Sequence, residues 1–295
     1  MALLWCGTVT SASATATAQS IGSARTEFQP VTPWNIDYAD DSCALVRRFS
    51  DGERQIWFEL RGVAPVDRVR LTLGTDRLGV TNENLHISVF PGREPLTPSA
   101  RFIEGDSDIA NAVVSTVSLN DFRVAWHRSL AEGSPHIAGE GDVREDRPAV
   151  AGIQVAEAFD ETLVLWTGDM EAALQALDVC MGDLVGSWGI DPAELAQAAT
   201  RPSALERDVW EPMVQRYYPR TGKRRSRNTT FPIVLLVNPQ GGVARCASPN
   251  ATGDEDFLQV ACAALMEYAR FEPARTADGR AVHGFWWTGM VYGIY

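Results

Sequence analysis

One amphipathic segment near the C-terminus, residues 254–271, constrains the fold more than any other part of the chain. It opens with three acids, Asp254-Glu255-Asp256, whose side chains suit the free amide groups and the positive dipole end of a helix. Apolar residues then recur every three or four positions until Pro273, which cannot continue a helix. The pattern predicts a helix with one apolar face that other elements must cover.

The segments on both sides of this helix are typical of β-strands. Residues 231–237 form an apolar run rich in β-branched residues, which stops at the turn cluster 238–242 and resumes at 243–248. After a second turn at 276–280, residues 281–294 are rich in aromatic and other apolar residues. The predicted order is strand, strand, helix, strand.

Short motifs in this last quarter of the chain resemble those of a known family. They are Tyr218-Pro219, the strand 233–237 with its turn 238–243, the helix core 257–265, the run 269–274 (Ala-Arg-Phe-Glu-Pro-Ala) and residues 278–282. On these motifs the segment resembles the TonB C-terminal domain of bacterial energy transducers. The resemblance implies a small antiparallel sheet with helices packed on one face. In transducers this domain grips a peptide segment of an outer-membrane transporter.

The chain departs from true transducers in one respect. The sequence shows neither an N-terminal membrane anchor nor a long Pro-rich spacer before the TonB-like segment. We therefore expect a non-enzymatic binding or adaptor protein rather than an energy transducer, unless an anchor lies upstream of Met1.

A small open sheet offers a site for this binding. An edge strand has unpaired backbone groups to which a partner peptide can add as a further strand. We expect residues 281–294 to be that edge, and Phe285, Trp287 and Val291 to contact an envelope protein, such as an outer-membrane transporter. Phe285, Trp286 and Trp287 also suit a sheet core, and a second copy of the domain could occupy the edge in a homodimer. The alternative function is a structural or inhibitor-like envelope protein that acts through its N-terminal β domain, without a role in transport.

Composition limits the other classes of partner. The chain has 295 residues, of which 45% are apolar and 22% charged, enough for two domains with separate cores. A net charge of −12 argues against nucleic acid or an anionic membrane as the main partner. The basic run 223–227 is a local exception, and suits either a solvated linker edge or a contact for an acidic partner.

The N-terminus is typical of an exported protein. Residues 2–9 form a short apolar core, and Ala16-Thr17-Ala18 fits a signal-peptidase site, although no basic residue follows Met1. We expect a signal peptide at residues 1–18 and a periplasmic mature protein without a membrane anchor.

The cysteine count agrees with export. Removal of the leader takes Cys6 away and leaves an even set of four cysteines. Cys246 ends a hairpin strand and Cys262 lies in the helix that must pack on it, so we expect these two to pair and Cys43 to pair with Cys180. Buried reduced thiols are the alternative.

The rest of the chain divides into an N-terminal domain and a link. Residues 34–200 show about eight short alternating strands separated by turn residues, and then two helices, from 169 and from 191. We expect an antiparallel sandwich or partly open barrel, a linker at 201–228 with three prolines, and the TonB-like domain at 229–295. The predicted fold class is thus α+β. The runs 34–38, 43–45, 180–185 and 187–189 also resemble exported Gram-negative proteins with a TonB-like C-terminus.

No motif in the sequence points to an enzyme. Gly105-Asp106-Ser107 is the one serine environment of interest, but Asp108 interrupts the glycine-rich loop that an oxyanion hole needs. The four histidines are scattered, and no Cys/His spacing suits zinc. We therefore expect no catalytic residue, metal or cofactor.

Overall fold

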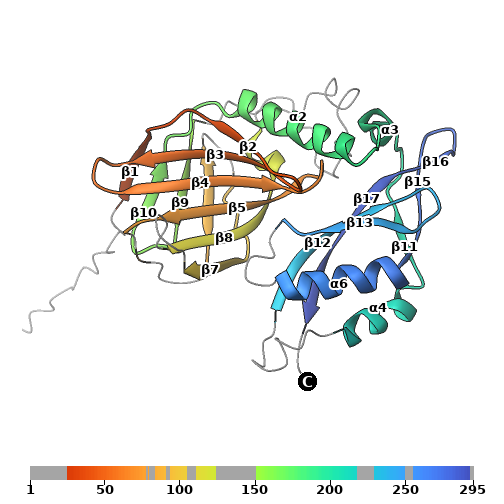
Figure 1. The fold of residues 1–295 in the computed structure, drawn as a ribbon. Coiled ribbons are helices and arrows are strands. Elements are labelled where there is room, and N and C mark those ends of the chain that lie inside the picture. The colour runs from red at the N-terminus through yellow and green to blue at the C-terminus, as the bar shows by residue number, and fades with distance from the viewer. Residues whose placement is uncertain are drawn as a thin grey trace, which may run out of the picture.

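The computed structural model describes residues 25–77, 79, 84–90, 94–104, 111–123, 151–217, 229–249 and 255–292. It consists of an N-terminal β domain, two helices that follow it, and a smaller C-terminal part with a sheet and helices (Figure 1). The predicted α+β class is confirmed. The expected leader, the basic run 223–227 and the helix start at Asp254 lie outside the described residues.

The β domain is one large curled sheet of ten strands. They are β1 (Arg25–Pro30), β2 (Asn35–Tyr38), β3 (Cys43–Ser50), β4 (Gln55–Gly62), β5 (Arg68–Thr75), β6 (His86–Phe90), β7 (Ala100–Glu104), β8 (Asn111–Ser118), β9 (Gly152–Ala156) and β10 (Thr162–Leu165). The order is β6-β9-β10-β1-β3-β4-β5-β8-β7, and β2 pairs with β3. All pairs in it are antiparallel, as expected, except β1 with β10, which makes the sheet mixed.

The two ends of this sheet approach each other. Isolated bridges join Ile87 to Leu96 and Asn84 to Ser99, so β6 meets the segment that leads into β7. The sheet is therefore curled into a half-barrel whose ends are joined only by isolated bridges. This agrees with the partly open barrel, which the strand pattern predicts as one of two forms, and not with the sandwich.

Apolar side chains alternate with polar ones along the strands, and the apolar ones fill the inside of the curled sheet. In β5, buried Leu71 and Leu73 alternate with half-buried polar residues, as expected for a sheet with one solvated face. Phe58 makes edge contacts with Phe49 and Phe122, with ring centroids 6.5 and 6.4 Å apart. Because each fully buried side chain of this size contributes roughly 1.5–3 kcal/mol, these rings are a main source of stability.

Two helices close the half-barrel and lead to the C-terminal part. α2 (Glu171–Ser187) packs against β2 and β3 and is joined to β3 by the disulfide Cys43–Cys180, whose Cα atoms are 6.0 Å apart. Arg123, which follows the short helix η1 (Leu119–Phe122), donates to both carboxylate oxygens of Asp178 on α2, at 2.8 and 2.7 Å. The shorter helix α3 (Pro192–Ala196) begins at the expected cap, Asp191, which accepts from the amide of Ala193.

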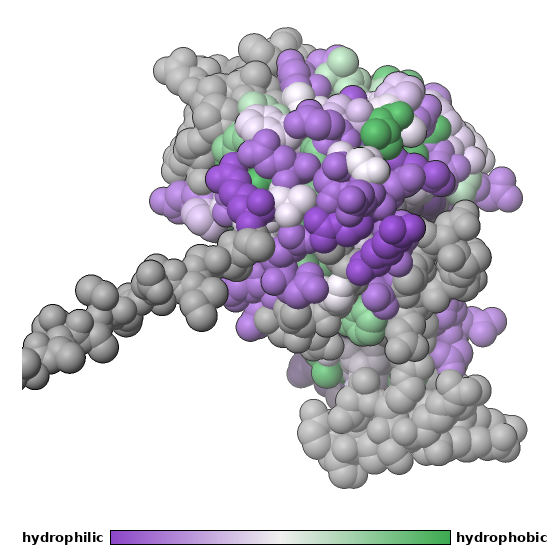
Figure 2. Space-filling view, turned by 90° about the vertical axis from the view of Figure 1, so that its left-hand side faces the viewer, coloured by the Kyte–Doolittle hydropathy of each residue, from purple (hydrophilic) through white to green (hydrophobic). Residues whose placement is uncertain are grey.

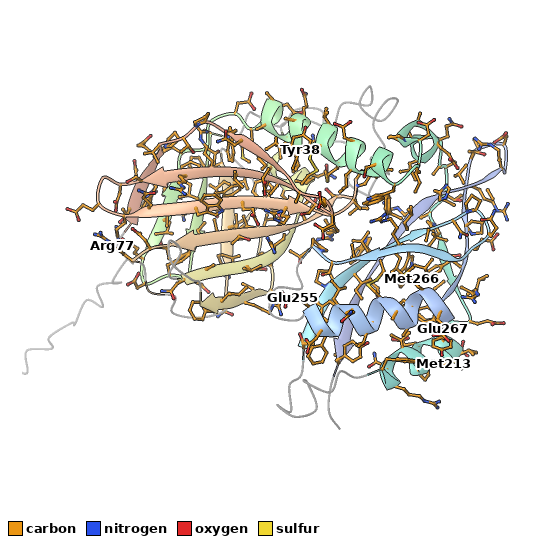
Figure 3. The ribbon with its side chains drawn as sticks, in the orientation of Figure 1. Tyr38, Arg77, Met213, Glu255, Met266 and Glu267 are labelled. Atoms are coloured by element: carbon orange, nitrogen blue, oxygen red, sulfur yellow. A yellow bond between two sulfur atoms is a disulfide. The ribbon has the colours of Figure 1, made fainter. Side chains whose placement is uncertain are left out.

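The C-terminal part is built around a three-stranded sheet. Its elements are β11 (Ser203–Leu205), α4 (Arg207–Arg216), β12 (Thr229–Val237), β13 (Val243–Ala247), α6 (Glu255–Tyr268), β14 (Arg270–Glu272), β15 (Ala274–Arg275), β16 (Ala281–Val282) and β17 (Gly284–Tyr292). The sheet has the order β13-β12-β17, and both pairs are antiparallel. α6 and α4 form its outer layer, on which Met213, Met266 and Glu267 lie (Figure 3). The order strand, strand, helix, strand is present as expected, with three very short strands between α6 and β17.

The stretch expected as a linker, residues 201–228, is described by the structure at residues 201–217. It contains β11, which pairs with β14, and the helix α4. Trp210 and Val214 lie four residues apart on one face of α4 and are buried in the core with Phe271. The prolines of this stretch predicted a linker. The spacing of Trp210 and Val214 instead gives α4 an apolar face, and α4 joins the C-terminal core because that face is buried.

The turn 238–242 shows why this part of the chain needs its glycines. Asn238 Oδ1 accepts hydrogen bonds from the amides of Gln240 and Gly242, both at 3.0 Å. Gly241 has a φ of +80°, and a methyl group on it would lie 2.1 Å from the carbonyl oxygen of Phe271. The turn therefore fixes both the hairpin and the approach of β14.

The β domain and the C-terminal sheet share a small apolar core. Val63, Ala64 and Val66 of the β4–β5 connection and Val185 and Leu195 of the helices pack with three residues of the sheet. Those three are Val234, Leu236 and Phe285. One face of the sheet is thus covered by the β domain and the other by α6 and α4. This double burial explains why β12 reads as an almost continuous apolar run.

The surface, the helices and the disulfides give information on the cellular compartment of the protein. The end of the molecule away from the C-terminal sheet is largely hydrophilic, with only scattered apolar residues among those coloured (Figure 2). None of the described helices is long and apolar enough to cross a membrane. The two disulfides, Cys43–Cys180 and Cys246–Cys262, suggest an oxidising, extracytoplasmic environment.

Candidate functional site

β17 lies at one edge of the three-stranded sheet. It pairs with β12 along its whole length, from Gly284 opposite Val237 to Tyr292 opposite Thr229. In the part of the chain that the structure describes, no other strand pairs with it. The outer edge of β17 is therefore a place where a further strand can add.

The direction of the backbone groups along β17 follows from its neighbour β12. Directly after β12, the amide of Asn238 donates to the carbonyl of Gly242 at 2.9 Å, so even-numbered residues of β12 direct their backbone groups towards β13. Odd-numbered residues therefore bond to β17. Pro232 agrees with this assignment, because it lacks an N–H and β13 ends opposite Val234, before reaching it.

The residues of β17 opposite even positions of β12 consequently direct their N–H and C=O groups to the free edge. They are Phe285, Trp287, Gly289 and Val291. All three residues that the sequence suggested as partner contacts, Phe285, Trp287 and Val291, are in this set. These three residues therefore share two features. Their backbone N–H and C=O groups point to the free edge, and their side chains lie on the face of the sheet that is turned to the β domain.

The three side chains differ in exposure. Phe285 is only 4% exposed and belongs to the core between the two parts of the molecule. Trp287 is 46% exposed and Val291 is 52% exposed. A partner strand would therefore meet the side chains of Trp287 and Val291, but only the backbone of Phe285.

The intervening residues of β17 build the other core. Trp286 packs on Phe271 with ring centroids 5.1 Å apart, and Tyr292 packs on Phe257 at 5.5 Å. Burial raises the pKa of Tyr292 to about 12. These two aromatic residues therefore anchor the strand to α6.

Positive charge lies beside the free edge. The guanidinium of Arg68, at the start of β5, is 5.2 Å from the ring centroid of Trp287, and that of Arg207 is 6.0 Å from Trp286. Arg207 is also paired with Glu211 at 3.0 Å, whereas Arg68 forms no ion pair with a described residue. Arg68 therefore places a positive charge beside Trp287, whereas Arg207 lies on the α6 face of the strand and its charge is balanced by Glu211.

The opposite edge of the sheet is tied to the helix. Cys246 of β13 and Cys262 of α6 form a disulfide with Cα atoms 5.4 Å apart. Both cysteine pairings expected from the sequence are present in the structure. Since β13 is also shorter than β12 and contains a register shift, β17 offers the longer and more regular edge.

The titratable residues considered for catalysis do not gather at one place. His86 lies 3.4 Å from Glu157 in the β domain, and His283 lies 3.4 Å from Glu194 beside α3. Within the described ranges, no group of three or more His, Cys, Asp and Glu residues could hold a metal ion. Ser107, His127 and His136 lie outside those ranges.

Sequence reasoning missed a buried ion network on the outer face of the half-barrel. Glu59 is 7% exposed and accepts hydrogen bonds from Arg70 at 2.6 Å and from Arg61 at 3.0 Å. Burial acts to raise the pKa of Glu59, but hydrogen bonding to the arginines and their charges outweigh it and hold the pKa below its usual value. The alternation of residues 57–61 could have shown that Glu59 points away from the apolar interior. It could not show that β5 supplies Arg70.

The described C-terminal residues thus combine a small sheet, an edge of β17 with no described partner strand, and exposed Trp287 with Arg68 beside it. Comparison of the chain with family models, with curated proteins and with solved structures finds no match.

Proposed function

We propose that this is a non-enzymatic binding or adaptor protein of the periplasm, and that its C-terminal part binds an extended peptide segment of an envelope protein. The peptide adds to β17 as a fourth strand. The observation that supports this function is the free edge along which Phe285, Trp287, Gly289 and Val291 direct their backbone groups outward. An outer-membrane transporter is the partner class implied by the TonB resemblance.

The side chains beside the edge suit such a peptide. Because an added strand continues the sheet, every second peptide side chain lies on the β-domain face, next to exposed Trp287 and Val291. Apolar peptide residues at these positions cover both side chains. Backbone hydrogen bonds supply affinity in this mode, and the alternate side chains supply specificity.

A pulldown from envelope extract tests the proposal with the full chain as bait. Val291→Pro removes one outward N–H, while the hydrogen bonds between β12 and β17 use the neighbouring residues. Val291→Thr is the matched control, because it keeps the N–H and the β-branched shape. We expect the wild type and Val291→Thr to recover the same partner, and Val291→Pro to lose it while its circular dichroism stays native. Recovery of that partner by all three proteins removes β17 from the mechanism and favours the β domain.

Hydrogen exchange distinguishes a peptide partner from a second copy of the chain. In the isolated monomer we expect fast exchange at Trp287, Gly289 and Val291, and slow exchange at Trp286 and Met290, whose amides face β12. A bound peptide should protect the first group. Protection that instead rises with protein concentration alone assigns the edge to a homodimer.

A further inference from the structure

A cavity of about 260 Å³ lies where the β domain meets the C-terminal sheet. Its apolar lining comes from both parts of the molecule: Val63 and Ala64 from the β4–β5 connection, Val234 and Leu236 from β12, and Phe285 from β17. All five are buried, and they are the same residues that hold the two parts together. The cavity is therefore a property of the assembled chain and of neither part alone.

Two opposite charges line the same cavity. Arg245 of β13 is exposed, and its guanidinium lies 4.3 Å from the ring centroid of Trp188. Asp41, in the turn between β2 and β3, is exposed as well. Neither side chain forms an ion pair with a described residue. The cavity thus offers a cation and an anion that have no ion-pair partner among the described residues.

Trp188 lines the cavity beside Arg245. Its indole Nε1 is buried and has no hydrogen-bond partner, and it exposes no surface to the cavity. The charged groups that a ligand in the cavity can reach are therefore Arg245 and Asp41.

We infer that this cavity binds a free α-amino acid with an apolar side chain. The carboxylate accepts from Arg245, the ammonium group pairs with Asp41, and the side chain rests on the apolar lining. A fatty acid leaves Asp41 unpaired and an amine leaves Arg245 unpaired, so only a zwitterion pairs with both charged groups of the lining. At about 30 Å³ per water-sized group, the volume holds about nine non-hydrogen atoms, the size of leucine.

Isothermal titration calorimetry on the full chain tests this inference with three ligands. Leucine has both charges, 4-methylpentanoate lacks the ammonium group, and 3-methylbutylamine lacks the carboxylate. We expect saturable binding of leucine, and binding about tenfold weaker or less for each analogue, because a hydrogen bond to a charged group is lost. No saturable binding of leucine, or equal binding of leucine and 4-methylpentanoate, overturns the inference.

Two pairs of variants locate the ligand. Arg245→Gln should weaken leucine binding about tenfold, whereas Arg48→Gln, which removes a guanidinium stacked 5.0 Å from Trp57 elsewhere on the surface, should not. Ala247→Phe should abolish binding because Ala247 lines the cavity, and Ala244→Phe on the same strand should not, because Ala244 does not line it. Unchanged leucine binding by Arg245→Gln or by a folded Ala247→Phe overturns the site.

This site is independent of strand addition at β17. Val291 does not line the cavity, so Val291→Pro should bind leucine as the wild type does. Failure of the peptide proposal and failure of the amino-acid site are therefore separate results.

Discussion

Glu59 shows at the scale of one residue how a carboxylate is kept charged in a place with little water. Burial alone favours the neutral acid, yet Arg61 and Arg70 lie on the same outer face and reverse the direction of the shift. Arg61 also reaches Asp37 at 3.0 Å and Ser42 at 2.9 Å, so the network joins β2 and the β2–β3 turn to β4 and β5. Its members are close in space because three strands bring them together.

The lowered pKa of Glu59 predicts a loss of stability in acid. The stabilisation is fully present above the unfolded-state pKa of about 4.3 and disappears as the pH falls through the lower folded-state pKa. We expect Glu59→Gln to lower the free energy of unfolding by about 2 kcal/mol at pH 7, and by clearly less near pH 3. Urea unfolding at both pH values measures this difference.

Glu53 provides the control for that experiment. It is exposed in the β3–β4 turn, and Glu53→Gln should change the free energy of unfolding little at either pH. A gap between wild type and Glu59→Gln that stays constant from pH 7 to pH 3 contradicts the assigned role of the charge.

Among the elements, β17 separates its core packing from its outer backbone edge, because successive residues of a strand point to opposite faces. Trp286 and Tyr292 pack towards α6, and Phe285 packs towards the β domain. Among the described strands, β12 alone pairs with β17, along its inner edge. Packing therefore anchors the strand through its side chains, and the backbone groups proposed to bind a partner lie along the other edge.

The two disulfides join elements over very different loop lengths, and this predicts a difference in their effect. Cys246 and Cys262 are 16 positions apart, and Cys43 and Cys180 are 137 apart. Loop-closure entropy predicts a contribution of about 3 kcal/mol for the first bond and about 5 kcal/mol for the second. We expect replacement of Cys43 and Cys180 by serine to lower the free energy of unfolding more than replacement of Cys246 and Cys262.

Urea unfolding with and without reductant measures both effects. Reductant should lower the stability of the wild type by more than it lowers either double variant. A wild type that unfolds identically in both conditions indicates that the thiols are not joined in solution.

At the scale of the whole molecule, the apolar junction makes the two parts depend on each other. The C-terminal sheet buries Val234 and Leu236 against the β domain, and a three-stranded sheet has little stability without such cover. We expect the wild type to unfold in a single calorimetric transition for this reason.

Val63→Asp tests that dependence. The side chain is 7% exposed at the junction, and a carboxylate without a partner there opposes docking of the two parts. We expect two separate transitions in differential scanning calorimetry, or a lowered Tm. Val179→Asp, on the exposed face of α2, is the matched control and should keep a single transition near the wild-type Tm. The same thermogram for both variants contradicts a coupled junction.

Local chemistry was sufficient to predict much of the fold. The apolar spacing predicted α6, although the helix ends at Tyr268 and Phe271, which was counted with it, lies in β14. The turn residues 238–242 predicted the hairpin, and the cap at Asp191 predicted α3, because each of these signals acts within a few residues. Cysteine counting together with element order also led to both disulfides. For the candidate site, the sequence pointed to Phe285, Trp287 and Val291 as one strand.

Long-range pairing decided the rest. Only the register between β12 and β17 shows that the backbone of these three residues faces the free edge, and only the packing of the β domain buries Phe285 while leaving Trp287 exposed. The parallel pairing of β1 with β10, the packing of α4, the Glu59 network and the junction cavity likewise depend on residues far apart in the chain. A single sequence specifies the apolar face of each helix and strand. Which of these faces pack against each other is decided by the lowest total free energy of the folded chain.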